Sequence, residues 1–252
     1  MKLPLDCDVA IIGGGVIGLS IAMSLQQTGK SVIVIDRNDK LINASRNNAG
    51  AFAFADILPL ATPQIIKAAP KWLLDPTGPL YIHPAYVFSI FPWMFRFWRA
   101  SLHDKFEKLL HAQASLMALS RDALERQVIE LKAEPLLHRK GQLRIYQHKK
   151  NFDRSAIFWN ACSLYDVRYT LLNSAAEIAE IQPGLNSTYE HAGFTPDWIN
   201  VTDPNSWLQH IQDLFIVRSG KWVDKRVDRI IPSQNGVSIK MEEHMVNASF
   251  CV

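Results

Sequence analysis

Three glycines near the N-terminus have the spacing of a phosphate-binding turn. Gly13, Gly15 and Gly18 follow the run DVAII at residues 8–12, which predicts a buried strand because it is apolar and rich in β-branched residues. In such a turn the first glycine permits the sharp bend, the second lets a pyrophosphate approach the backbone, and the third lets the next helix pack closely. The start of that helix stabilises an anion through unpaired N–H groups and the helix dipole.

An acidic residue completes the pattern. Residues 19–27 predict a helix that Gly29 ends, and the run SVIVI at residues 31–35 predicts a second strand leading to Asp36. A carboxylate about twenty residues beyond the glycine turn accepts hydrogen bonds from the ribose of an adenosine and disfavours the 2′-phosphate of NADP. The whole window therefore predicts a dinucleotide site. A glycine-rich turn that only packs a sheet is the alternative, and it leaves Asp36 unexplained.

The spacing does not distinguish NAD from FAD, because both kinds of fold share this unit. Residues 8–50 resemble the N-terminus of the D-amino acid oxidase superfamily of FAD-dependent oxidoreductases, and most of all the bacterial D-amino acid dehydrogenase small-subunit type. The resemblance rests on the early glycine motif, the strand end Ile35-Asp36-Arg37, the loop ASRNNAG at residues 44–50, and a Trp-rich stretch after it.

The resemblance implies FAD as the cofactor. It implies that the 44–50 loop wraps the ribityl and flavin portions, that the residue after the acid lies near the adenine, and that Val227 touches the adenine through its main chain. A polar loop that caps the next helix is the alternative for residues 44–50. The predicted cofactor-binding residues are Ile12, Gly13, Gly14, Gly15, Val16, Ile17, Gly18, Ile35, Asp36, Arg37, Ala44, Ser45, Asn48, Ala49, Gly50 and Val227.

The resemblance also implies the fold class, which is α/β. A Rossmann-like FAD-binding domain would carry an inserted α+β substrate domain with a mixed sheet. The predicted parts are residues 1–65 for the first part of the FAD-binding domain, 66–200 for the substrate domain, and 201–252 for the return to the FAD-binding domain. The family places its carboxylate-binding arginine and tyrosine, and a glycine loop beside the flavin, after this point. We therefore expect both domains to be C-terminally incomplete, and no catalytic residue is predicted.

The middle of the chain is rich in proline and then in aromatic residues. Residues 59–92 hold seven of the 13 prolines, which predicts turns and short segments. The run YVFSIFPWMFRFW at residues 86–98 predicts either a core-facing helix broken at Pro92, the favoured interpretation, or a surface that touches membrane lipid. Residues 101–134 predict a long amphipathic helix. Its acids are expected to form a solvated face: Asp104, Glu107, Asp122 and Glu125.

The second half of the chain has weaker signals. Residues 141–146 alternate like a strand, in which Arg144 is either a surface arginine or a residue of the substrate cavity. Residues 175–185 resemble a short helix of the family, and a further helix is expected from Asn205. Strands are predicted at residues 222–230 and 237–241.

The net charge and the cysteines of the chain exclude some classes of function and favour others. A net charge of +3 over 252 residues gives no reason to expect a nucleic-acid partner. The three cysteines, Cys7, Cys162 and Cys251, form no CxxC pair and no metal-ligand cluster with histidines, so no metal site is predicted and a cytoplasmic location with reduced thiols is expected. The resemblance adds peripheral contact with the inner face of the plasma membrane or with an electron carrier.

Two functional hypotheses follow from these features. The first is an FAD-dependent oxidoreductase of amino acid catabolism, present as a truncated form, that oxidises a D-alanine-like D-amino acid or related amine by hydride transfer to flavin. The second is a non-catalytic dinucleotide-binding fragment, or a subunit of a split flavoenzyme whose partner chain supplies the C-terminal half. An NAD-dependent dehydrogenase is a third alternative. The substrate side chain, electron acceptor and oligomeric state are not predicted.

Overall fold

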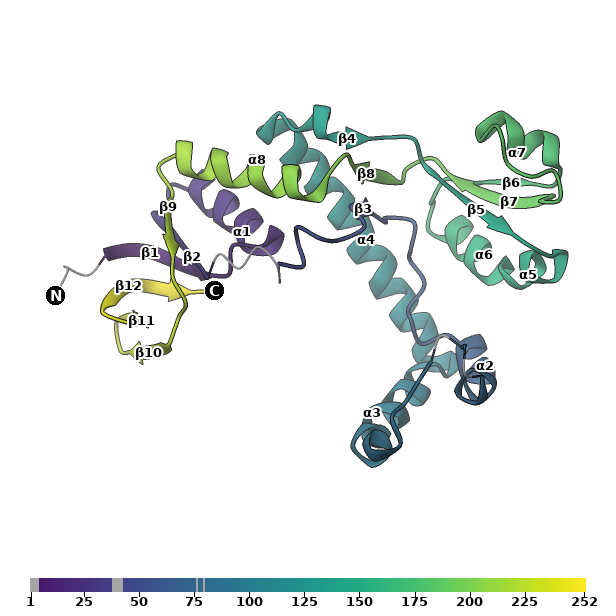
Figure 1. Ribbon diagram of the computed structural model, residues 1–252, viewed down its shortest axis with the longest axis horizontal. Coiled ribbons are helices and arrows are strands. Elements are labelled where there is room, and N and C mark those ends of the chain that lie inside the picture. The colour runs from purple at the N-terminus through teal and green to yellow at the C-terminus, as the bar shows by residue number, and fades with distance from the viewer. Residues whose placement is uncertain (1–4, 38–42, 76, 79) are drawn as a thin grey trace. The chain divides into compact units, whose positions relative to one another are not determined.

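The computed structural model describes residues 5–37, 43–75, 77–78 and 80–252 (Figure 1). The chain forms two compact units. Unit 1 combines Met1–Ala51, Gln127–His138 and Asn200–Val252, and unit 2 combines Phe52–Arg126 and Arg139–Ile199. The chain therefore passes between the units four times, so unit 1 is assembled from three separate stretches of sequence. The domain boundaries predicted at residues 65 and 200 stay predictions.

Unit 1 is built on a six-stranded mixed sheet. Its order is β10-β11-β12-β1-β2-β9. Strand β1 lies in parallel pairing between β12 and β2, β9 is parallel to β2, and β10 and β11 continue the other side in antiparallel pairing. The strands are β1 (Leu5–Ile12), β2 (Val32–Asp36), β9 (Lys221–Asp224), β10 (Arg229–Ser233), β11 (Gly236–Met241) and β12 (His244–Cys251).

The core of unit 1 follows from this pairing. The central parallel strands are nearly continuous apolar runs, and Ile11, Ile33 and Ile35 are fully buried, as expected of strands covered on both faces. Helices α1 (Val16–Gln27) and α8 (Pro204–Val217) pack against each other (Figure 1). Helix α8 begins at Pro204 because the carboxylate of Asp203 accepts hydrogen bonds from the next backbone N–H groups.

Unit 2 combines a three-stranded sheet with helices. Strand β7 is the middle strand, antiparallel to β5 and β6, and a core cluster around Phe158, Trp159 and Cys162 lies in this unit. Its strands are β5 (Gln142–Tyr146), β6 (Thr170–Leu172) and β7 (His191–Thr195). Its helices are α2 (Pro63–Leu74), η1 (Pro84–Tyr86), α3 (Val87–Ala100), α5 (Lys149–Arg154), α6 (Ala156–Leu164) and α7 (Ala175–Ile181).

The remaining elements belong to stretches in which the chain changes units. Helix α4 (His103–Leu131) contributes residues to both units. Three short strands form a small sheet in the order β3-β8-β4, and a 3₁₀ helix, η2 (Glu134–Leu136), precedes β4. The short strands are β3 (Ala51–Phe52), β4 (Leu137–His138) and β8 (Ile199–Val201).

Several elements agree with the sequence predictions. The two N-terminal strands and the helix between them form as β1, β2 and α1, and the long amphipathic helix forms as α4. The carboxylates of α4 that were predicted to be solvated are well exposed and take part in surface ion pairs. The strand at residues 142–146, the short helix α7 and the helix α8 also form where the sequence indicated them.

Three predictions about elements were wrong. The proline-rich segment contains a regular 12-residue helix, α2. Pro63 occupies its first turn, where a missing N–H costs nothing, and the helix continues through Pro70; Pro76 and Pro79 lie outside the described residues. Helix α3 continues through Pro92 and has no buried residue, so it is neither broken nor core-facing. The predicted strand at residues 222–230 is interrupted by four non-strand residues between β9 and β10.

Candidate dinucleotide site

The glycine turn and the acid come together at one edge of the unit 1 sheet. Strand β1 ends at Ile12, Gly13 turns the chain with a φ of +109°, and α1 begins at Val16. Asp36, the last residue of β2, accepts a hydrogen bond at 2.6 Å from the backbone N–H of Gly14. The carboxyl ends of two neighbouring parallel strands thus hold the turn and the carboxylate side by side, which is where ligands bind in open α/β sheets.

The start of α1 suits an anion. Its first turn contains no acidic side chain, and Gly15 occupies the N-cap position without a side-chain hydrogen bond. The backbone N–H of Val16 donates to the hydroxyl of Ser45 at 3.0 Å. The positive end of the helix dipole lies at this turn, so this end of α1 is electrostatically favourable for a phosphate.

Steric crowding explains why glycines occupy the turn. A Cβ atom on Gly18 would collide with the carbonyl oxygen of Gly13 and lie 3.2 Å from Cγ2 of Ile11, so α1 packs directly on the turn and the strand. A Cβ on Gly14 would lie 2.8 and 2.9 Å from two ring carbons of Trp222 and closer still to a third. Gly14 lies between two glycines of the motif, and the motif itself does not require a glycine there. The closeness of Trp222 explains why Gly14 has no side chain, and the sequence alone does not show this contact.

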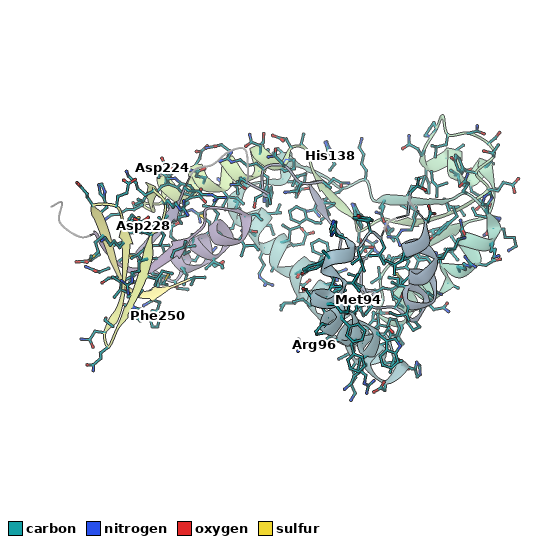
Figure 2. The ribbon with its side chains drawn as sticks, turned by 60° about the horizontal axis from the view of Figure 1, so that its bottom comes forward. Met94, Arg96, His138, Asp224, Asp228 and Phe250 are labelled. Carbon is teal, nitrogen blue, oxygen red and sulfur yellow. The ribbon has the colours of Figure 1, made fainter. Side chains whose placement is uncertain are left out.

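A pocket of about 270 Å³ opens beside the turn. Gly13, Asp36 and Val227 lie around it, together with Lys225 and Arg226. Figure 2 labels Asp224 and Asp228, which bracket the segment that carries Lys225 to Val227 after β9. Small-molecule sites commonly measure roughly 300–1,000 Å³, so this pocket is large enough for part of a dinucleotide. Its full lining is Ile12, Gly13, Ile35, Asp36, Arg37, Lys225, Arg226 and Val227.

Two cations of this pocket were missed by the sequence analysis. Lys225 and Arg226 immediately precede Val227, which was predicted on the resemblance alone. The ammonium of Lys225 forms an ion pair with Glu242 at 2.9 Å, and this contact raises the pKa of Lys225. The basic pair in the sequence was an available signal, but only the pairing of β9 with β2 brings it opposite Asp36.

The 44–50 loop is held by its own polar groups. The side-chain amide of Asn48 donates to the carbonyls of Ala44 and Ser45, and its oxygen accepts from the N–H of Gly50 at 2.6 Å. Gly50 has a φ of +64°, and a Cβ there would lie 2.6 Å from Cγ2 of Val201. The loop is therefore preformed, with the hydroxyl of Ser45 at the start of α1.

The predicted residues differ in how they relate to the pocket. Ile12, Gly13, Ile35, Asp36, Arg37 and Val227 line it. Gly14, Gly15, Val16, Gly18 and Ser45 form the turn and the helix start beside it. Ile17 is 75% exposed on α1, and Ala44, Asn48 and Ala49 lie exposed in the loop. For all of these residues, and for Gly50, a role in binding FAD stays a prediction.

Arg144 of unit 2 is engaged in an ion pair. Its guanidinium lies 2.9 Å from the carboxylate of Asp56 and 4.2 Å from the ring centroid of Phe158. The side chain is 31% exposed. The carboxylate partner and the aromatic neighbour hold the guanidinium in place within unit 2, and a role of Arg144 toward a substrate stays a prediction.

Sheet, turn and acid define a nucleotide-binding protein of the open α/β class. Residues 8–249 match the family model described as FAD dependent oxidoreductase, DAO, and the chain belongs to this family. The predicted recognition and the prediction of FAD as the cofactor are thereby confirmed.

Curated relatives agree with this assignment. The chain is 28% identical over 227 residues to a D-amino-acid oxidase of Bradyrhizobium diazoefficiens, covering 88% of the chain and 53% of the relative. It is 26% identical over 236 residues to D-amino acid dehydrogenase 1 of Mesorhizobium japonicum, covering 91% of the chain and 56% of the relative. The chain thus spans about half the length of these relatives.

Solved structures show the same fold. Glycine oxidase from Geobacillus kaustophilus superposes with a TM-score of 0.69 at 16% identity, over 98% of this chain and 54% of that one. An L-alpha-glycerophosphate oxidase from Mycoplasma pneumoniae with FAD bound superposes with a TM-score of 0.63 at 12% identity, over 100% of this chain and 53% of that one. The predicted fold class is confirmed.

Proposed function

We propose that this chain binds FAD and takes part in the oxidation of a D-amino acid or a related amine, with D-alanine as the first substrate to test. One observation carries the proposal: the glycine turn, the Asp36 carboxylate and the Ser45 hydroxyl meet at the carboxyl ends of the parallel strands β1 and β2. The curated relatives named D-amino-acid oxidase and D-amino acid dehydrogenase support the substrate class.

The described residues fit the adenosine diphosphate half of FAD. The backbone at Gly13 and Gly15 lacks side chains that would keep a pyrophosphate away from α1, and Asp36 can accept hydrogen bonds from a ribose. Arg37 and Val227 line the remaining wall of the pocket, where an adenine would lie. When bound, the flavin supplies the acceptor for the hydride that leaves the α-carbon of the substrate.

The residues of the chain would act on the cofactor by holding it. The helix start neutralises phosphate charge, the carboxylate fixes the ribose, and the preformed 44–50 loop offers the Ser45 hydroxyl. Rigid placement of this kind lowers the entropic barrier to a reaction between two bound molecules. Binding and orientation are therefore the contributions we assign to unit 1.

Binding of FAD tests the proposal directly. The purified chain is titrated with FAD and then with NAD, and flavin fluorescence and absorbance are recorded. We expect FAD to bind and NAD not to bind. Replacing Asp36 with Ala should raise the Kd for FAD about tenfold or more, because a hydrogen bond to a charged group contributes roughly 1.5–3 kcal/mol.

A matched control separates this effect from loss of one negative charge. Glu243 is an exposed carboxylate in the turn between β11 and β12 of the same unit, and Glu243→Ala should leave the Kd unchanged. If FAD fails to bind, or if Asp36→Ala binds FAD as tightly as the natural sequence does, the proposed site is wrong. D-Alanine-dependent reduction of a dye by the FAD-loaded chain then tests the substrate class.

A second candidate is a dinucleotide-binding chain with no turnover of its own. It is favoured by the pairing of Arg144 with Asp56, which gives that arginine a carboxylate partner within unit 2. The outcome that supports it is an FAD-loaded chain that does not reduce dye with any D-amino acid tested. Turnover that persists in the purified chain would exclude it.

We also propose a cytoplasmic location. All three cysteines are free thiols, which is the usual state in a reducing compartment. Among residues 5–37, 43–75, 77–78 and 80–252, no helix combines the length and apolar content that crossing a membrane requires. Fractionation of cells that produce the chain, with the thiols labelled in urea at the moment of lysis, tests the location.

A further inference from the structure

Helix α2 borders a pocket of its own in unit 2. The pocket measures about 550 Å³, which falls within the roughly 300–1,000 Å³ of small-molecule sites. All of its lining residues belong to unit 2, and none of them borders the pocket beside the glycine turn. We call it the α2 pocket, and its lining includes Thr62, Ile65, Ala68, Lys71, Trp72 and Arg154.

Two polar contacts fix the wall of the α2 pocket. The hydroxyl of Thr62 accepts a hydrogen bond from the N–H of Ile65 and caps the start of α2. The side-chain amide of Gln64, which also lines the pocket, donates to the carbonyl of Arg154 at 3.4 Å, in the last turn of α5. The start of α2 and the end of α5 are therefore joined before any ligand binds.

Two cations border the α2 pocket, and no acidic residue is among the described residues that line it. Lys71 and Arg154 are exposed. No ion pair in the described part of the chain includes either of them. The pKa of Asp75 is lowered mainly by hydrogen bonds from Thr77 and to a smaller extent by the charge of Lys71. Both positive charges are therefore available to an anion in the pocket.

The rest of the lining is mainly apolar. Ile65, Ala68 and Trp72 follow one another at steps of three and four, so one side of α2 presents them together. The indole of Trp72 offers a flat face on which an aromatic ring can stack. A hydrocarbon in this pocket would leave the two cations without a partner, and an inorganic anion would leave the apolar wall in water. An organic anion satisfies both parts of the lining.

We propose that the α2 pocket binds a small arylcarboxylate, an organic anion with an aromatic body and one carboxylate. The carboxylate is held by Lys71 and Arg154, and the ring packs on Trp72. The Thr62 hydroxyl, which accepts from the backbone, keeps its own proton for donation to the ligand. Binding requires only residues of unit 2 and does not depend on FAD, so its failure and the failure of the proposed function are distinguishable.

Saturation-transfer NMR with three probes tests the chemistry of the pocket. 1-Naphthaleneacetate has the aromatic body and the carboxylate, 1-naphthaleneacetamide lacks the charge, and acetate lacks the aromatic body. We expect naphthaleneacetate to bind the full chain with a Kd of about 1 mM or lower, and the amide to bind about tenfold more weakly. No binding of naphthaleneacetate up to about 10 mM, or equal binding of acid and amide, would overturn the proposal.

Removal of each cation assigns the carboxylate to the pocket. Lys71→Gln and Arg154→Gln should each raise the Kd for naphthaleneacetate about threefold, and together about tenfold, with little effect on the amide. The matched controls are Lys240→Gln on β11 and Arg229→Gln on β10, which remove equally exposed charges from unit 1. The controls should leave the Kd unchanged. Equal effects of pocket and control variants would show general attraction to positive charge and contradict a site at α2.

Two neighbouring alanines of α2 provide a steric test. Ala68 lines the α2 pocket, whereas Ala69 lines a separate apolar groove between α2 and α3. Ala68→Phe should fill the pocket and abolish binding of naphthaleneacetate, and Ala69→Phe should leave it unchanged. The reverse result would place the probe in the groove and overturn the proposal. Circular dichroism checks the fold of both variants, and the exposed Lys71→Gln variant decides the question if Ala68→Phe does not fold.

FAD separates the α2 pocket from the dinucleotide site. Saturating FAD should leave the Kd for naphthaleneacetate unchanged, because no residue borders both pockets. Displacement of naphthaleneacetate by FAD would place the anion in the dinucleotide site and overturn the proposal. Binding of naphthaleneacetate that depends on Lys71 and Arg154, by a chain that does not bind FAD, would support the α2 pocket and contradict only the proposed function.

Discussion

Replacement of Gly14 by alanine tests the packing of the turn against Trp222. The new Cβ would lie 2.8 Å from Cζ3 and 2.9 Å from Cζ2 of the indole, with Cη2 nearer still, whereas carbon atoms in contact stay about 3.5–4.0 Å apart. The ring cannot yield freely, because its Nε1–H donates to Asp224 at 2.7 Å. The backbone of Trp222 is also fixed, because Trp222 belongs to β9, which pairs with β2 in the sheet.

The magnitude follows from these contacts. Overpacking costs about 1–3 kcal/mol, and loss of the indole hydrogen bond adds about 1 kcal/mol. We therefore expect Gly14→Ala to lower the free energy of unfolding by about 3 kcal/mol. Trp222→Ala removes the obstructing ring. In that background, Gly14→Ala should lower the free energy of unfolding by no more than about 1 kcal/mol, so the coupling energy between the two substitutions is about 2 kcal/mol.

Urea denaturation followed by far-ultraviolet circular dichroism measures all four proteins of this cycle. Gly29→Ala is the control, because Gly29 has a φ of +78° and no atom within 4 Å of an added Cβ. It should cost about 1–2 kcal/mol from backbone strain and add to Trp222→Ala without coupling. Strict additivity of Gly14→Ala and Trp222→Ala would refute the steric explanation of Gly14.

Three further outcomes can be checked. Gly193→Ala should destabilise unit 2 by about 1–3 kcal/mol in thermal unfolding, because the added Cβ would press on the buried ring of Trp159. Hydrogen bonds from Ser206 lower the pKa of Asp203 in the folded chain. The Asp203 carboxylate therefore stabilises the fold at pH values above its unfolded pKa, and this stabilisation is lost as the pH falls through its folded pKa. Asp203→Ala should lower the unfolding midpoint at pH 7 and leave it unchanged at a pH below the folded pKa. Burial raises the pKa of the Cys162 thiol to about 11, so it should not react with a disulfide reagent at pH 8 until urea is added.

The elements around the glycine turn were predictable because their signals are local. Apolar strands, glycines and Asp36 fall within one short window, and each has a stereochemical reason that needs no distant partner. The 44–50 loop was assigned to the cofactor by family resemblance alone, and the contact between the Ser45 hydroxyl and the start of α1 was not predicted. The crowding of Gly14 by Trp222 joins positions 208 residues apart in the sequence, which no local pattern records.

Helix α3 shows the limit of composition as a guide. An aromatic run favours the core when only hydrophobicity is considered, yet exposure depends on which surfaces the rest of the chain can cover. The same limit applies to Lys225 and Arg226, which join the pocket through the pairing of β9 with β2.

The discontinuous assembly of unit 1 has a consequence for synthesis on the ribosome. Leu5 of β1 pairs with Val246 of β12. One edge of β1 therefore has no strand partner until residues near 246 have been synthesised. At about 5–20 residues per second, that wait lasts on the order of ten to fifty seconds. The contiguous stretches of unit 2 emerge in the meantime. The nascent chain therefore exposes an unpaired apolar strand edge until β12 has been synthesised, the situation in which chaperones prevent aggregation.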